Sequence, residues 1–172
     1  GHNLKEVKNL KVRDKYQKLF NLCSKLMLQI VEGKKPVIAK VHGAAYAAGC
    51  QLVASCDLAY STKDALFATP GVNIGLFCST PMVAVSRKIN RKTMMKMLLT
   101  GEPIKANYAK EIGLINDFFP SNRLNKETLK IAKVIGSKSN LTIKIGKRAF
   151  YKQLEMPLKK AYEYTSKMMT LN

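Results

Sequence analysis

A run of very small residues in the first third of the chain places the tightest limit on its fold. The run consists of Ala44, Ala45, Ala47, Ala48 and Gly49. A β-branched segment at 37–42 precedes it and predicts a strand, and an apolar segment at 50–55 follows it and predicts a short helix. Small side chains let backbone approach backbone or a ligand closely. The run therefore predicts either tight helix–strand packing or a site where main-chain groups meet a ligand.

Strand and helix patterns alternate early in the chain, and helices dominate later. We expect further strands at 57–61, 65–68 and 114–119, with a loop at 69–71. We expect further helices at 4–32, 81–88, 91–99, 105–112, 123–136, 140–155 and 158–169. Thr80 is placed to cap the helix at 81–88, with Pro81 at its first position. Since no repeat or linker interrupts these 172 residues, we expect one α/β domain over 1–172.

The chain is strongly basic, with 30 Lys and Arg against 11 Asp and Glu and a net charge of +19. Such a charge suits a polyanion, an anionic small substrate or a lysine-biased proteome. Lysines are spread through the later helices, for example Lys126, Lys130, Lys133 and Lys138. A diffuse excess favours compositional bias over a nucleic-acid footprint. No run of about 18 uncharged apolar residues occurs, so we expect no membrane span.

The four cysteines, Cys23, Cys50, Cys56 and Cys78, form no C-x-x-C pair. Only two histidines, His2 and His42, accompany them. A zinc site needs tight pairs of ligands, so we expect no metal, and instead buried free thiols in a reducing compartment.

Several segments together carry a family resemblance. Residues 35–60 read KPVIAKVHGAAYAAGCQLVASCDLAY, and 67–75 read FATPGVNIG. LTGEPI at 99–104, AKEIGLI at 109–115 and FP at 119–120 follow in order. This series resembles the enoyl-CoA hydratase/isomerase (crotonase) family over nearly the whole chain. The resemblance implies a crotonase-like ββα spiral with a helical C-terminal part, and a homotrimer or hexamer.

The resemblance also bears on the two ends of the chain and on location. Residues 1–6, GHNLKE, resemble the end of the family's first oxyanion loop. We therefore expect a domain truncated at both ends, without the family's N-terminal strands and last C-terminal segment. The segments are most similar to a mitochondrial subgroup, which implies a mitochondrial protein, or otherwise a cytoplasmic one.

Enolate stabilisation is the chemistry that the family shares. Two backbone N–H groups point at the thioester oxygen, and losing one such donor costs about 10²–10³ in rate. By position, these donors are the amides of His2 and Ala48, the latter replacing a glycine. The resemblance implies an acyl-CoA thioester as substrate, with coenzyme A as its part and no separate cofactor. The residues expected to line its site are Tyr46, Ala47, Gly49 and Ser79.

The sequence departs from the family at the two catalytic glutamates of hydratases. Gln51 stands at the first position and Gly71 at the second. A glutamine side chain can hydrogen-bond water but cannot accept its proton at neutral pH. A general acid or base contributes about 10²–10⁴ in rate. We therefore expect hydration by the two-glutamate route to be slow.

Three functions remain open. The first is a lyase or isomerase of fatty-acid and acyl-CoA metabolism, in which another group, or an anion near Gly71 and the amides of 78–80, moves the proton. The second is a catalytically weak acyl-CoA-binding protein. The third is RNA binding by lysines on one side of the first helix, Lys8, Lys11, Lys15 and Lys18. A solvated face with compositional bias is the favoured interpretation of this row.

Two further residues have non-catalytic interpretations. His42 is expected to be partly buried and satisfied, and Asp57 is expected to cap or to pair with another group.

Overall fold

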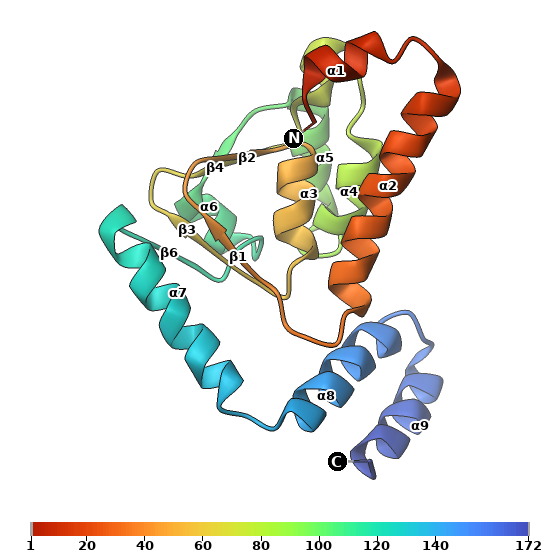
Figure 1. The fold of residues 1–172 in the computed structure, drawn as a ribbon, viewed down its shortest axis with the longest axis vertical. Coiled ribbons are helices and arrows are strands. Elements are labelled where there is room, and N and C mark those ends of the chain that lie inside the picture. Colours follow the sequence, from red (N-terminus) through yellow and green to blue (C-terminus); the bar gives the residue numbers. More distant parts are fainter. Residues whose placement is uncertain (1, 172) are drawn as a thin grey trace.

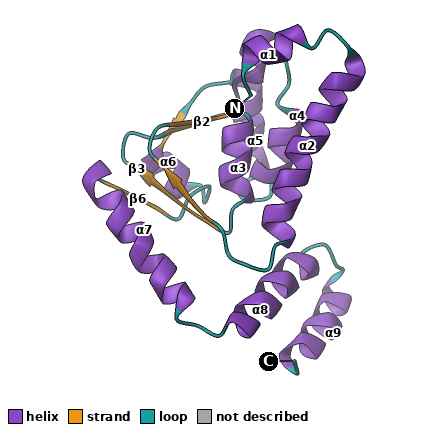
Figure 2. Cartoon of the chain, in the orientation of Figure 1, coloured by secondary structure: helices purple, strands orange, loops and turns teal. Residues whose placement is uncertain are grey.

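The computed structural model describes residues 2–171, and its α/β fold confirms the expected class (Figures 1 and 2). Strands β1 (Ile38–Val41), β3 (Leu58–Thr62) and β6 (Asp117–Phe119) form one parallel sheet in the order β1-β3-β6. A second sheet has the order β2-β4-β5, from β2 (Ala44–Tyr46), β4 (Leu66–Ala68) and β5 (Ile104–Lys105). In it β2 and β4 are parallel, while β4 and β5 are antiparallel.

The spiral follows from how consecutive strands are shared between the two sheets. The chain leaves β1, turns at Gly43 into β2 of the other sheet, and continues into helix α3 (Ala48–Ser55). The next pair, β3 and β4, repeats this step and leads through a short 3-10 helix (Pro70–Ile74) into α4 (Ser79–Val85). Two successive ββα units are thus stacked by parallel pairing, as the predicted ββα spiral requires.

The core lies around α3, which packs against β2, α4 and α2 (Arg13–Glu32). Cys50 and Ala54 of α3 are almost fully enclosed, as are Phe67 of β4 and Val85 of α4. The small side chains of Cys50 and Ala54 allow α3 to approach its neighbours closely. The close-packing interpretation of the small-residue run is therefore correct for Ala45, which lies in this core, and for Ala47, which packs against it.

Later helices complete the chain. These are α5 (Arg91–Thr100), α6 (Ala106–Glu111), α7 (Ser121–Gly136), α8 (Asn140–Gln153) and α9 (Leu158–Met169). Helix α7 packs on the β1-β3-β6 sheet, whereas α8 packs on α2 and α9, at the far end of the molecule from α1 (Leu4–Asn9) (Figure 1). Within residues 2–171, every helix is too short or too polar to cross a lipid bilayer.

The predicted first helix, 4–32, is wrong at one point, because it is two helices. Helix α1 ends at Asn9 and α2 begins at Arg13, after an extended Val12. Between them Lys11 adopts φ = 51°, in the left-handed region that no helix continues through. Lys8 therefore lies on α1, Lys11 in the connector, and Lys15 and Lys18 on α2. The four lysines do not line one side of one helix.

Smaller differences concern element boundaries. Strands β2 and β5 were not expected, because Ala44–Tyr46 and Ile104–Lys105 are short and gain their order from pairing with β4. The strand expected at 114–119 is only Asp117–Phe119. Helix α4 starts at Ser79 with Cys78 as its N-cap residue and no side-chain cap. Thr80 is therefore not the cap, and Pro81 is the third helical residue rather than the first.

Candidate functional site

The candidate site begins at the turn between β2 and α3. Ala47 has φ = 48° and ψ = −114°, a conformation that glycine adopts readily and alanine only with strain. Its N–H donates to the carbonyl oxygen of Ala68 at 2.9 Å, and its carbonyl accepts from the amide of Gln51 at 3.0 Å. This turn begins the eight-residue helix α3 at Ala48. The first amides of α3 have no partner inside the helix and carry the positive end of its dipole.

Gln51 lies one turn further along α3, on the same face as Ala48. Its side chain is almost fully buried, with 4% of the residue exposed. The thiol of Cys23, on α2, donates to Gln51 Oε1 at 3.8 Å. The main-chain carbonyl of Gln51 accepts from Ser55 Oγ at 2.8 Å. A helical side chain leans toward the N-terminus of its helix, so Gln51 covers the first turn of α3.

Gly71, predicted to stand at the second glutamate position of hydratases, is enclosed by its own loop. A β-carbon added there would lie 2.4 Å from the carbonyl oxygen of Leu76 and 2.9 Å from Cys78 Sγ. The amide of Gly71 donates to the same thiol at 3.3 Å, and its carbonyl accepts from Leu76 N–H at 2.9 Å. This backbone has no room for a side chain at position 71. The sequence alone did not reveal this.

The structure places the other site candidates as follows. Tyr46 and Gly49 flank the Ala47–Ala48 turn and are half-buried. The half-buried His2 packs its ring edge-on against Phe20 of α2, with ring centroids 5.8 Å apart. Ser79 is exposed at the start of α4, where its hydroxyl donates to Phe77 O at 3.3 Å.

Chain continuity brings Tyr46, Ala47, Ala48, Gly49 and Gln51 together around the start of α3. Within residues 2–171, no hydrogen bond or ring contact joins His2 to α3. The pairing of the His2 and Ala48 amides as two donors therefore stays a prediction.

Two thiols, predicted from the sequence only to be buried, contact the two residues predicted to replace the hydratase glutamates: Cys23 contacts Gln51, and Cys78 contacts Gly71. Burial raises the pKa of both thiols, so they are protonated at neutral pH. Burial raises the pKa of Cys50 to about 12 and that of Cys56 to about 11. The expectation of free thiols is confirmed for all four cysteines, although Cys23 is only half-buried.

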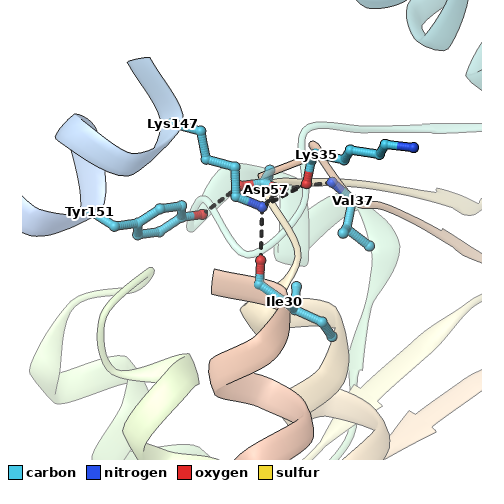
Figure 3. A network of polar contacts seen from close by, with 6 residues as sticks. All are labelled: Ile30, Lys35, Val37, Asp57, Lys147 and Tyr151. Atoms are coloured by element: carbon cyan, nitrogen blue, oxygen red, sulfur yellow. Dashed lines mark hydrogen bonds and ion pairs between the residues drawn. The ribbon is translucent and has the colours of Figure 1, made fainter. Parts of the chain in front are cut away.

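Asp57 pairs, as expected, and it joins the spiral to the C-terminal helices (Figure 3). Its Oδ2 accepts from Lys147 Nζ of α8 and from the amide of Val37, both at 2.7 Å, and its Oδ1 accepts from Tyr151 Oη at 3.0 Å. Lys147 also donates to the carbonyls of Ile30 and Lys35, at 2.7 and 2.9 Å. Burial, and then the charge of Asp57, raise the pKa of Tyr151, so its hydroxyl remains a donor. These contacts tie α8 to α2, to the segment before β1 and to Asp57.

The remaining predicted features lie away from this site. His42 is exposed, so the expectation that it is partly buried is wrong; it follows β1, which ends at Val41. A hollow of about 690 Å³ lies beside β4, β5 and β6, and a second, of about 510 Å³, lies on α7. Neither hollow is lined by a residue of α3, so neither is the candidate site.

Comparison with known proteins defines the class. The family model described as "Enoyl-CoA hydratase/isomerase" matches residues 1–171, and the chain belongs to this family. The structure superposes with a TM-score of 0.97 on an enoyl-CoA hydratase from Mycobacterium smegmatis, at 46% identity over 99% of this chain and 66% of that one.

Similarity to individual relatives indicates a narrower group within this family. The chain is 49% identical over 172 residues to human "Enoyl-CoA hydratase domain-containing protein 3, mitochondrial", covering 100% of this chain and 57% of that protein. The human protein's crystal structure matches with a TM-score of 0.96, over 99% of this chain and 67% of that one. "Enoyl-CoA hydratase, mitochondrial" of Pongo abelii is 32% identical, over 98% of this chain and 57% of that protein. The chain thus spans less than two thirds of the length of these curated relatives.

Proposed function

We propose that the protein binds acyl-CoA thioesters with the thioester carbonyl at the start of α3. The observation that carries the proposal is the strained turn at Ala47, which begins an eight-residue helix and leaves the Ala48 amide without a partner inside that helix. Backbone strain of this kind persists where the surrounding structure requires it, and it concentrates at functional sites. The family to which the chain belongs is named for enoyl-CoA chemistry. The His2 amide is the proposed second donor, and coenzyme A enters only as part of the substrate.

Hydration through two carboxylates is not part of this proposal. Gln51 can donate or accept a hydrogen bond but cannot take a proton from water at neutral pH. Gly71 has no side chain, and the Leu76 carbonyl oxygen lies where a β-carbon would begin. That oxygen also disfavours an anion at the same point, since both carry negative charge. We therefore propose either enolate chemistry of the lyase or isomerase type with another proton carrier, or binding without turnover.

Nucleic acid is not proposed as a ligand. The lysine row that suggested it is divided between α1, the connector at Lys11 and α2. We propose instead that the protein acts in mitochondrial acyl-CoA metabolism, as the names of its relatives suggest. A homotrimer or hexamer is also proposed; exposed apolar side chains on α9, such as Leu158 and Tyr162, support a further contact surface.

Titration calorimetry of the full-length protein with butyryl-CoA and with free coenzyme A tests the binding site. Ala48 is the first residue of α3, where proline fits and removes only the N–H. The matched pair is Ala47→Gly, which relieves the turn, and Ala47→Gly with Ala48→Pro. We expect the pair to differ by about 3–10-fold in butyryl-CoA affinity, as one hydrogen bond predicts, and not in coenzyme A affinity. Equal butyryl-CoA affinities in the pair, or no binding at all, would refute the proposed site.

A further inference from the structure

In the side-chain amide of Gln51, the oxygen is hydrogen-bonded and the nitrogen is not. Its oxygen accepts from the Cys23 thiol at 3.8 Å. Its nitrogen makes no hydrogen bond to any group of residues 2–171. Among the fully enclosed side-chain polar atoms of residues 2–171, those without a hydrogen-bond partner are the hydroxyl oxygens of Thr62 and Thr69. Gln51 Nε2 also has no partner but is not one of these fully enclosed atoms. It is therefore accessible, although the residue is only 4% exposed.

Cys23 determines which end of the amide is free. Burial raises the pKa of this thiol, so the sulfur keeps its proton and acts as a donor. In the structure this thiol donates to the amide oxygen of Gln51, at 3.8 Å, and the amide nitrogen faces away from that contact. Oε1 is thereby held toward α2, and the two N–H bonds of Nε2 are left for another partner.

The free amide nitrogen lies beside the free amides at the start of α3. Residues three apart on a helix have β-carbons about 5–6 Å apart, so Ala48 and Gln51 share one face. Both groups donate hydrogen bonds, and the glutamate positions that supply acceptors in hydratases are Gln51 and Gly71 here. A ligand on this face meets donors at two points separated by roughly one helical turn.

We propose that Gln51 selects acyl-CoA thioesters whose acyl chain carries an acceptor oxygen, a carbonyl or carboxylate, on the β or γ carbon, and that Cys23 is the positioning residue that presents the Gln51 amide nitrogen to it. The proposal rests on the proposed binding of the thioester at Ala48. It assigns a recognition role to the position where a hydratase holds the water that it adds. An acyl chain without such an oxygen leaves the Gln51 donors unpaired and binds more weakly.

Acetoacetyl-CoA and butyryl-CoA form the test pair, because they have equal chain length and differ in the β-carbonyl oxygen. The readout is the ratio of their dissociation constants, measured by titration calorimetry with the full-length protein. We expect the wild type to bind acetoacetyl-CoA about 3–10-fold more tightly, as one added hydrogen bond predicts. Gln51→Leu should bring the ratio close to one, and Gln51→Glu should reverse it because a carboxylate repels the β-carbonyl oxygen.

Variants of Cys23 show whether its thiol orients the Gln51 amide or only fills space between α2 and α3. Cys23→Ala releases Oε1, so the amide presents either end and the ratio falls toward one, whereas Cys23→Ser keeps a donor and keeps the ratio. Gln29→Leu, the same change at an exposed position of α2, is the matched control and should keep the wild-type ratio. A wild-type ratio of one with butyryl-CoA still bound, or a preference that survives Gln51→Leu, overturns this inference alone. Failure of both thioesters to bind overturns the proposed function as well.

Discussion

The Cys78 thiol occupies the space beside Gly71 into which a side chain at this position would extend. Gly71 N–H donates to Cys78 Sγ at 3.3 Å, and a β-carbon at position 71 would lie 2.9 Å from the same sulfur. On its other side stands the carbonyl oxygen of Leu76, only 2.4 Å from that β-carbon. Gly71 is thus a packing requirement of this loop.

Even one methyl group at position 71 should destabilise the protein. We expect Gly71→Ala to lower the free energy of unfolding by about 1–3 kcal/mol, because backbone must move to admit the β-carbon. Gly71→Glu should be at least as costly and should not restore hydration. Urea unfolding followed by circular dichroism measures the change.

Gly146→Ala provides the control for position 71. Gly146 lies inside α8, and no atom comes within 4 Å of an added β-carbon. Alanine is favoured over glycine in a helix by about 1 kcal/mol, so this variant should gain stability. A Gly71→Ala variant as stable as the wild type would show that the loop relaxes freely around position 71.

Breaking the Asp57–Lys147 pair should cost more than breaking any exposed pair. The two side chains are 15% and 5% exposed, and Lys147→Met leaves the Asp57 carboxylate without its cation. We expect a loss of about 3–5 kcal/mol in the free energy of unfolding. Lys110→Met, which breaks the exposed pair with Asp117, should cost less than about 1 kcal/mol. Similar losses in the two variants, measured by urea unfolding, would argue against the anchoring role of the buried pair.

The turn at Ala47 should become more stable with glycine. A non-glycine residue at φ = 48° and ψ = −114° carries about 1–3 kcal/mol of strain, which exceeds the entropic cost of glycine. We expect Ala47→Gly to raise the free energy of unfolding by about 1 kcal/mol. Ala132→Gly, inside α7, should lower it by a similar amount. Thermal unfolding of both variants compares the two signs directly; a loss in Ala47→Gly contradicts the assignment of strain.

Thiol labelling should follow burial and pKa together. Only the thiolate attacks a disulfide reagent, and a pKa raised above the ordinary value lowers the thiolate fraction at pH 8. Cys50, fully enclosed and with a pKa of about 12, should not react until the protein unfolds. Cys23, the only half-buried thiol among the four, should react first. Mass spectrometry after timed labelling gives the order, and early modification of Cys50 would contradict the packing around α3.

Local patterns were sufficient for most of the fold, and contacts distant in sequence account for the rest. The small-residue run predicted the close packing around the start of α3, and the family resemblance implied that Asp57 caps or pairs. The break at Lys11 was not predictable, because no glycine or proline marks its left-handed backbone. Likewise, β5 owes its order to pairing with β4.

For the candidate site, too, local sequence patterns predicted some of the residues, and contacts distant in sequence account for the others. Gln51 and Gly71 were identified from their spacing within the family motifs. Their partners Cys23 and Cys78 were not, since Cys23 precedes Gln51 by 28 residues and meets it only when α2 packs on α3. Similarly, only the folded loop reveals the crowding at Gly71 by Leu76.

We propose above that the protein binds enoyl-CoA thioesters but lacks the two-carboxylate route to hydrate them. Incubation of the full-length protein with crotonyl-CoA in H₂¹⁸O, with binding followed in parallel by calorimetry, measures both parts of the claim. We predict saturable binding, with ¹⁸O incorporation at least 10²-fold below that of a two-glutamate hydratase assayed alongside. Incorporation at ordinary enzyme rates of about 1–10³ s⁻¹, or the absence of binding, would contradict it.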